Sequence, residues 1–134
     1  MIQITGLTEV VLSVKNMELM VQFYRDILGL KILYPQNVSV YTNENRVTFW
    51  AGACTLALHS GGREHQEMDS PRIVFGVNNI ERSRSYLLQR EVLVGEIRLI
   101  SPGILVCDAV DPEGNRFSLE YHQLITDVPS QHIL

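Results

Sequence analysis

The stretch from Glu9 to Leu30 constrains the fold of this chain more than any other. It opens with an apolar, largely β-branched run, Val10 to Val14, which predicts a buried strand. Asn16 is a suitable helix N-cap, and Gly29 suits the left-handed position that ends a helix. Between them, apolar residues recur at the spacing of one helical face, at Met20, Phe23, Tyr24, Ile27 and Leu28. The stretch therefore predicts a strand, a tight turn and a helix over residues 17–28 that packs on a sheet.

This unit occurs twice. A shift of 63 positions places residues 9–18 over residues 72–81 with four identities in ten, among them the capping residues Asn16 and Asn79. A repeated strand, cap and helix in the same order indicates an internal duplication. A second helix is predicted over residues 80–90, with three residues on its inner face, Tyr86, Leu87 and Leu88.

The remaining strands complete a βαβββ order in each half. In the first half they are predicted at about residues 7–14, 31–34, 46–50 and 54–59, and the strand at 31–34 continues with alternation over 38–42 after an interruption at 35–37. In the second half they are predicted at about residues 72–77, 94–100, 104–109 and 116–121. We expect a single domain over residues 1–134, with repeat 1 at about 7–60, a polar linker at 61–70, repeat 2 at about 71–122 and a tail at 123–134. The predicted class is α+β, with curved mixed sheets around a cavity and helices on the outer face.

Composition narrows the classes of partner. The net charge is −4 and there is no basic cluster, which argues against nucleic acid as a partner. No apolar run approaches the ~20 residues that span a bilayer, and the first residues do not resemble a signal peptide. Cys54 and Cys107 lie in predicted strands and are expected to be reduced. These features predict a cytoplasmic protein.

The sequence resembles the vicinal oxygen chelate superfamily, which includes glyoxalase I, bleomycin-resistance proteins and extradiol dioxygenases. The resemblance rests on Val10 to Val14 followed by Phe23-Tyr24 and Leu28-Gly29-Leu30, on the echo of this unit in the second half, and on the turn at residues 111–115. It implies the paired βαβββ fold and a homodimer. It says little about the reaction, because one fold hosts many chemistries.

The resemblance also implies four positions for the ligands of a divalent metal. Carried over one at a time, they fall on Glu9, Ala57, Arg72 and Ser118. Glu9 alone is an ordinary ligand, and the guanidinium of Arg72 cannot be one. We therefore expect no metal and no other cofactor.

Strand alternation places further polar residues on the same face as these positions. The expected ligand-binding residues are Glu9, His59, Arg72, Arg116, Ser118 and Glu120. Glu9 and Arg72 are repeat mates expected to face each other, either as an internal ion pair or around a ligand.

Three functions follow from this set. The leading hypothesis is metal-independent binding of a small polar or anionic organic molecule in the cavity between the repeats. The second is a lyase, isomerase or dioxygenase with an off-pattern metal held by Glu9, His59 and Glu120. The third is a structural or regulatory dimer whose cavity is packed shut. Whether the protein is an enzyme stays open, because no nucleophile–base pair stands out.

Overall fold

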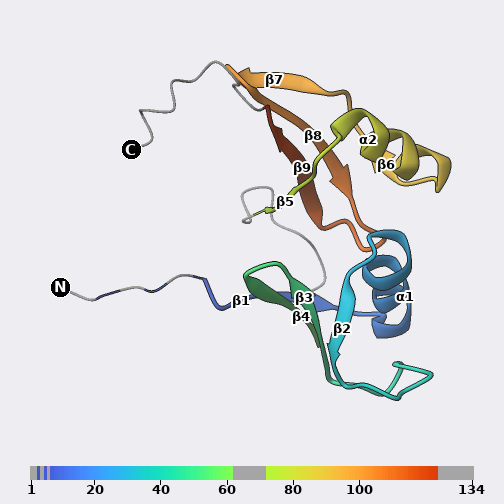
Figure 1. The fold of residues 1–134 in the computed structure, drawn as a ribbon. Helices are drawn as coiled ribbons and strands as arrows, with labels where there is room; N and C mark the ends of the chain where they lie inside the picture. Colours follow the sequence, from blue (N-terminus) through green and yellow to red (C-terminus); the bar gives the residue numbers. More distant parts are fainter. Residues whose placement is uncertain (1–2, 4, 6, 62–71, 124–134) are drawn as a thin grey trace. The chain divides into compact units, whose positions relative to one another are not determined.

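The computed structural model describes residues 3, 5, 7–61 and 72–123. The chain forms two compact units, Met1–Met68 and Asp69–Leu134 (Figure 1). The predicted linker lies outside the described residues except for Gly61, and so does the tail except for Gln123.

The first unit has the predicted βαβββ order. Its elements are β1 (Glu9–Val14), α1 (Met17–Gln22), η1 (Phe23–Ile27), β2 (Lys31–Tyr34), β3 (Arg46–Ala51) and β4 (Cys54–Ser60). The sheet order is β1-β4-β3-β2, with β1 parallel to β4 and the other neighbours antiparallel. The helix therefore lies in the connection that carries the chain from one edge strand to the other.

The first helix begins and ends where the sequence predicted. The side chain of Asn16 accepts a hydrogen bond from the backbone N–H of Leu19 at 3.0 Å, and Gly29 follows the helix with φ 78°. The last turn is a π-helix, in which the N–H of Leu28 donates to the carbonyl of Phe23. The apolar stripe is buried at its start, while Ile27 and Leu28 are only half-buried.

The core of the first unit lies between this helix and one face of the sheet. Strand pairing places Val47 opposite Leu58 and Phe49 opposite Leu56, and all four are buried. Tyr24 of the helix packs on Phe49 with ring centroids 6.3 Å apart. The opposite, helix-free face carries the alternate residues of β1, β3 and β4.

The predicted strand at residues 38–42 is wrong. This segment is a loop with Asn37 at φ 63°, and the backbone N–H of Tyr41 donates to the carboxylate of Glu18 on α1. Tyr41 is buried and lies under the guanidinium of Arg25. The segment is therefore held to the helix at Tyr41 and does not pair in the sheet.

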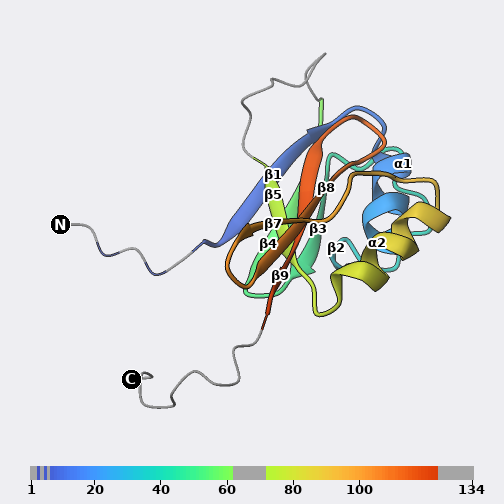
Figure 2. The same ribbon diagram turned by 90° about the horizontal axis from the view of Figure 1, so that it is seen from above.

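The second unit follows the same plan with one additional strand. Its elements are β5 (Ile73–Gly76), α2 (Ile80–Gln89), β6 (Leu93–Val94), β7 (Arg98–Ser101), β8 (Ile104–Val110) and β9 (Arg116–His122). The sheet order is β5-β9-β8-β6, and β7 also pairs with β8. As in the first unit, the first and last strands are parallel, and the helix covers one face of the sheet (Figures 1 and 2).

Two details of the second half differ from prediction. The strand expected at residues 94–100 is divided into β6 and β7, because residues 95–97 leave the strand after the N–H of Gly95 makes a last bond to the carbonyl of Asp108. On α2, Leu87 is buried as predicted, but Tyr86 and Leu88 are 37% and 45% exposed. Neighbouring helical positions point in different directions, so three in a row cannot share one face. Ile80 is the other buried residue of α2.

The turn before β9 has the predicted structural role. The carboxylate of Asp111 accepts hydrogen bonds from the backbone N–H groups of Glu113 and Asn115, both at 2.9 Å, and Gly114 has φ 89°. Asp111 and Asn115 are buried. The polar side chains of this turn therefore serve its own backbone.

The predicted α+β class is confirmed, with one mixed sheet in each half. No helix in the described part of the chain is long and apolar enough to cross a membrane. Cys54 and Cys107 are free thiols, as expected. The single domain and the cavity between the repeats stay predictions.

Candidate ligand-binding faces

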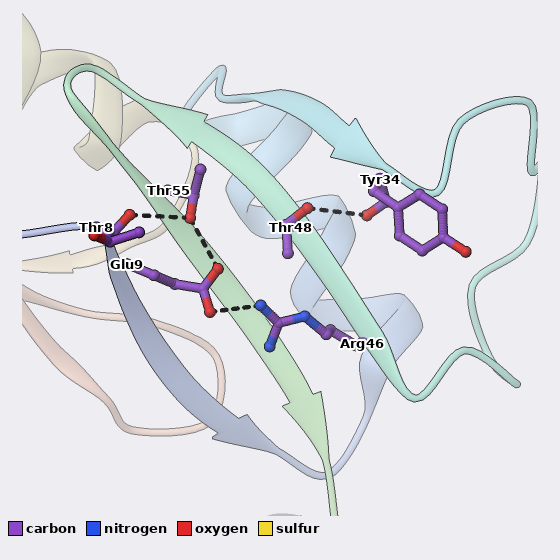
Figure 3. A network of polar contacts seen from close by, with 6 residues as sticks. All are labelled: Thr8, Glu9, Tyr34, Arg46, Thr48 and Thr55. Carbon is purple, nitrogen blue, oxygen red and sulfur yellow. Dashed lines mark hydrogen bonds and ion pairs between the residues drawn. The ribbon is translucent and has the colours of Figure 1, made fainter.

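The helix-free face of the first sheet carries a compact polar cluster around Glu9 on β1. One carboxylate oxygen accepts a hydrogen bond from the hydroxyl of Thr55 on β4 at 2.9 Å, and the other forms an ion pair with Arg46 on β3 (Figure 3). Glu9 and Thr55 are register partners, so their side chains lie on the same face. The cluster therefore joins three strands of this sheet.

The cluster keeps Glu9 ionised. Hydrogen bonds from Arg46 and then Thr55 lower the pKa of its carboxyl, and the nearby His59 adds a smaller effect of the same sign. His59 is the register partner of both Ser13 and Arg46, and it is exposed. Glu9 and His59 thus share a face, as predicted.

The helix-free face of the second sheet carries a cluster around Asp108 on β8. Its Oδ1 accepts a hydrogen bond from the hydroxyl of Ser118 at 2.6 Å, and its Oδ2 accepts one from Arg98 at 2.8 Å. The guanidinium of Arg72 lies 3.7 Å from Oδ1. One carboxylate therefore faces two guanidinium groups and one hydroxyl.

Burial and hydrogen bonding act on Asp108 in opposite directions. Partial burial raises the pKa of its carboxyl, but the hydrogen bonds from Ser118 and Arg98, with the charges of Arg98 and Arg72, outweigh it and lower the pKa. Asp108 is therefore a carboxylate at neutral pH. The side chain of Ser118 is almost fully buried, so the carboxylate is its fixed acceptor.

Two more predicted residues lie along β9. Glu120 is two positions beyond Ser118, and its carboxylate lies 2.8 Å from Nε2 of His122. Arg116 is exposed at the start of the strand. Strand alternation places Arg116, Ser118 and Glu120 on one face, as the sequence predicted.

The strand registers support the predicted correspondence between the halves. Val11 pairs with Ala57 in the first half, and its repeat mate Val74 pairs with Ser118 in the second. Ala57 and Ser118 are thus equivalent, and the same register makes His59 equivalent to Glu120.

The side chains at the four positions implied for a metal do not fit a divalent ion. Ala57 has no donor atom, and Arg72 is cationic. The hydroxyl of Ser118 is hydrogen-bonded to Asp108. The carboxylate of Glu9 is bound by Arg46 and Thr55. Within residues 7–61 and 72–123, no group of three or more His, Cys, Asp or Glu residues is arranged to hold a metal.

The cluster residues that the sequence analysis missed are Arg46, Thr55, Arg98 and Asp108. Within its own unit, Glu9 pairs with Arg46, and Arg72 pairs with Asp108. Asp108 had a signal, because it is the single charge inside the apolar run of β8. The arginines had none, since a strand-end arginine is ordinarily solvated.

Comparisons with known proteins support the fold. No family model matches the sequence, and no curated protein matches it. Among solved structures, a putative glyoxalase family protein from Bacillus anthracis matches with TM-score 0.71 and 16% identity, covering 92% of this chain and 99% of that one. The lactoylglutathione lyase from Agrobacterium tumefaciens has TM-score 0.69 and 17% identity, covering 89% and 95%. The fosfomycin resistance protein FosX from Listeria monocytogenes has TM-score 0.72 and 18% identity, covering 91% and 97%.

These structures are members of the vicinal oxygen chelate superfamily. The resemblance stated from the sequence is therefore confirmed for the fold.

Proposed function

We propose that this protein binds a small polar or anionic organic molecule on the helix-free faces of its sheets, without a metal ion. The proposal rests on the side chains at the expected metal-ligand positions. Of the four positions where the fold's metal enzymes are expected to hold their ion, three have no suitable ligand and the fourth is neutralised by an arginine. A cation at Arg72 would meet a fixed positive charge, whereas an anion would be attracted.

Metal analysis tests this proposal directly. The protein is purified without chelator, offered Zn²⁺, Ni²⁺, Mn²⁺ and Fe²⁺ in turn, desalted, and its metal content is measured. We expect no ion near one per chain, and no change of melting temperature on adding each metal. One retained ion per chain, lost in Glu9→Ala or His59→Ala, would overturn metal independence and favour the off-pattern metal enzyme.

The expected homodimer and cytoplasmic location belong to the same proposal. The homodimer is expected from the resemblance, and the cytoplasmic location is expected from the composition. Light scattering coupled to size-exclusion chromatography measures the molar mass in solution, and we expect twice the chain mass of 15.2 kDa.

A further inference from the structure

We infer that Arg72 and Arg98 form an anion-binding pair that takes the carboxylate or phosphonate group of the ligand. This inference rests on the proposed function and narrows its ligand to organic oxyanions. It concerns the second unit alone, and four of its side chains, Arg72, Arg98, Asp108 and Ser118.

The strand order brings the two arginines to one carboxylate from opposite sides. Arg72 directly precedes β5, whereas Arg98 begins β7. β5 pairs with β9, β9 with β8, and β8 with β7, so Asp108 on β8 lies between the two strands that carry the guanidinium groups. The register pair Asp108–Ser118 anchors this carboxylate in the middle of the sheet.

The two guanidinium groups keep most of their hydrogen-bonding capacity. Each carries five N–H bonds. Arg98 donates one to Asp108, and Arg72 lies at ion-pair distance from the same carboxylate but beyond hydrogen-bonding distance. Within the described residues these are the polar contacts of the two side chains, which are 51% and 38% exposed. Their remaining N–H groups are therefore available to a ligand.

The charge around the pair favours an anion. At the pair itself, Arg72 and Arg98 carry two positive charges, and the Asp108 carboxylate between them carries one negative charge. This excess is positive although the whole chain has a net charge of −4. Carboxylates and phosphonates present two or three oxygens, which suits donors that approach from two sides.

Calorimetric titration with three probes of one shape tests the pair. Benzoate and phenylphosphonate carry the oxyanion, and benzamide is the neutral control. At low ionic strength, where screening is weak, we expect at least one anion to bind more tightly than benzamide. We expect Arg72→Ala and Arg98→Ala each to weaken that binding about ten-fold, and the double variant to abolish it. Arg82→Ala, which removes an exposed arginine on α2, should leave the affinity unchanged.

The outcomes separate this inference from the proposed function. Unchanged affinity in Arg72→Ala and Arg98→Ala, or equal binding of benzamide and benzoate, would overturn the arginine pair and leave metal-free binding intact. Failure of both anions to bind the unaltered protein would also overturn the pair. A stoichiometric metal would instead overturn the proposed function. Circular dichroism of each variant shows whether it is folded, and Arg72→Lys and Arg98→Lys, which keep the charge, should restore part of the affinity.

Discussion

The polar clusters of the two halves both combine a carboxylate with guanidinium groups, but they differ in net charge. In the first half, the carboxylate of Glu9 on the first strand meets one guanidinium, that of Arg46 on the third. In the second half the signs are exchanged, with Arg72 just before the first strand and Asp108 on the equivalent of the third. A second arginine, Arg98, adds a surplus positive charge.

This difference shows which parts of the duplicated unit are constrained by folding. The Asn cap and the parallel pairing of first and last strands appear in both halves, because each sheet needs a helix to cover one face. Charges on the other face do not support this packing. The two halves differ in these charges, and one cluster is balanced whereas the other is cationic.

The largest predicted effect comes from removing the central carboxylate of the cationic cluster. Asp108→Ala should lower the free energy of unfolding by about 1–3 kcal/mol, because the buried hydroxyl of Ser118 loses its acceptor and two guanidinium groups lose their counter-charge. Urea unfolding measures the loss, and hydrogen exchange should localise it to the second unit. Asp108→Asn keeps an acceptor for Ser118 and should be less destabilising. A stable Asp108→Ala variant would show that the cluster contributes nothing to folding.

The helix caps should instead respond alike in the two halves. The side chains of Asn16 and Asn79 accept hydrogen bonds from the backbone N–H groups of Leu19 and Arg82 at 3.0 and 2.9 Å. Asn16→Ala and Asn79→Ala should each cost about 1 kcal/mol, and the glycine variants only a few tenths. The measurement is the same urea series. Clearly unequal losses would mean that the duplicated caps are no longer equivalent.

The smallest predicted effect is a loss of folding stability at acidic pH. The pKa values of Glu9 and Asp108 are both lowered in the folded protein from ordinary values of 4.5 and 3.8. The carboxylates therefore add stability that is present above the ordinary pKa and lost as the pH falls through the lowered one. Unfolding free energies measured from about pH 5 downward should fall less steeply in Glu9→Gln and in Asp108→Asn than in the unaltered protein. Parallel pH profiles would contradict this expectation.

The sequence by itself determined the framework of the protein. Local signals were sufficient for the first strand, the Asn caps, the helix end at Gly29 and the turn at Asp111, because each depends on neighbours a few residues away. The repeat then predicted the second half from the first. Strand alternation placed Ser118 and Glu120 on one face, because side-chain direction follows from position along a strand.

Tertiary structure decided the partners of the charges. The ion pair of Glu9 with Arg46 spans 37 positions, and the cluster at Asp108 joins residues from three strands and from the segment before β5. Which arginine reaches a carboxylate depends on strand order and register, which no local pattern encodes. The strand predicted at residues 38–42 was wrong for a related reason. The backbone N–H of Tyr41 bonds Glu18 on α1, and the segment does not pair in the sheet as its alternation predicted. The surplus positive charge of the cluster at Asp108 is thus a property of strand order rather than of composition.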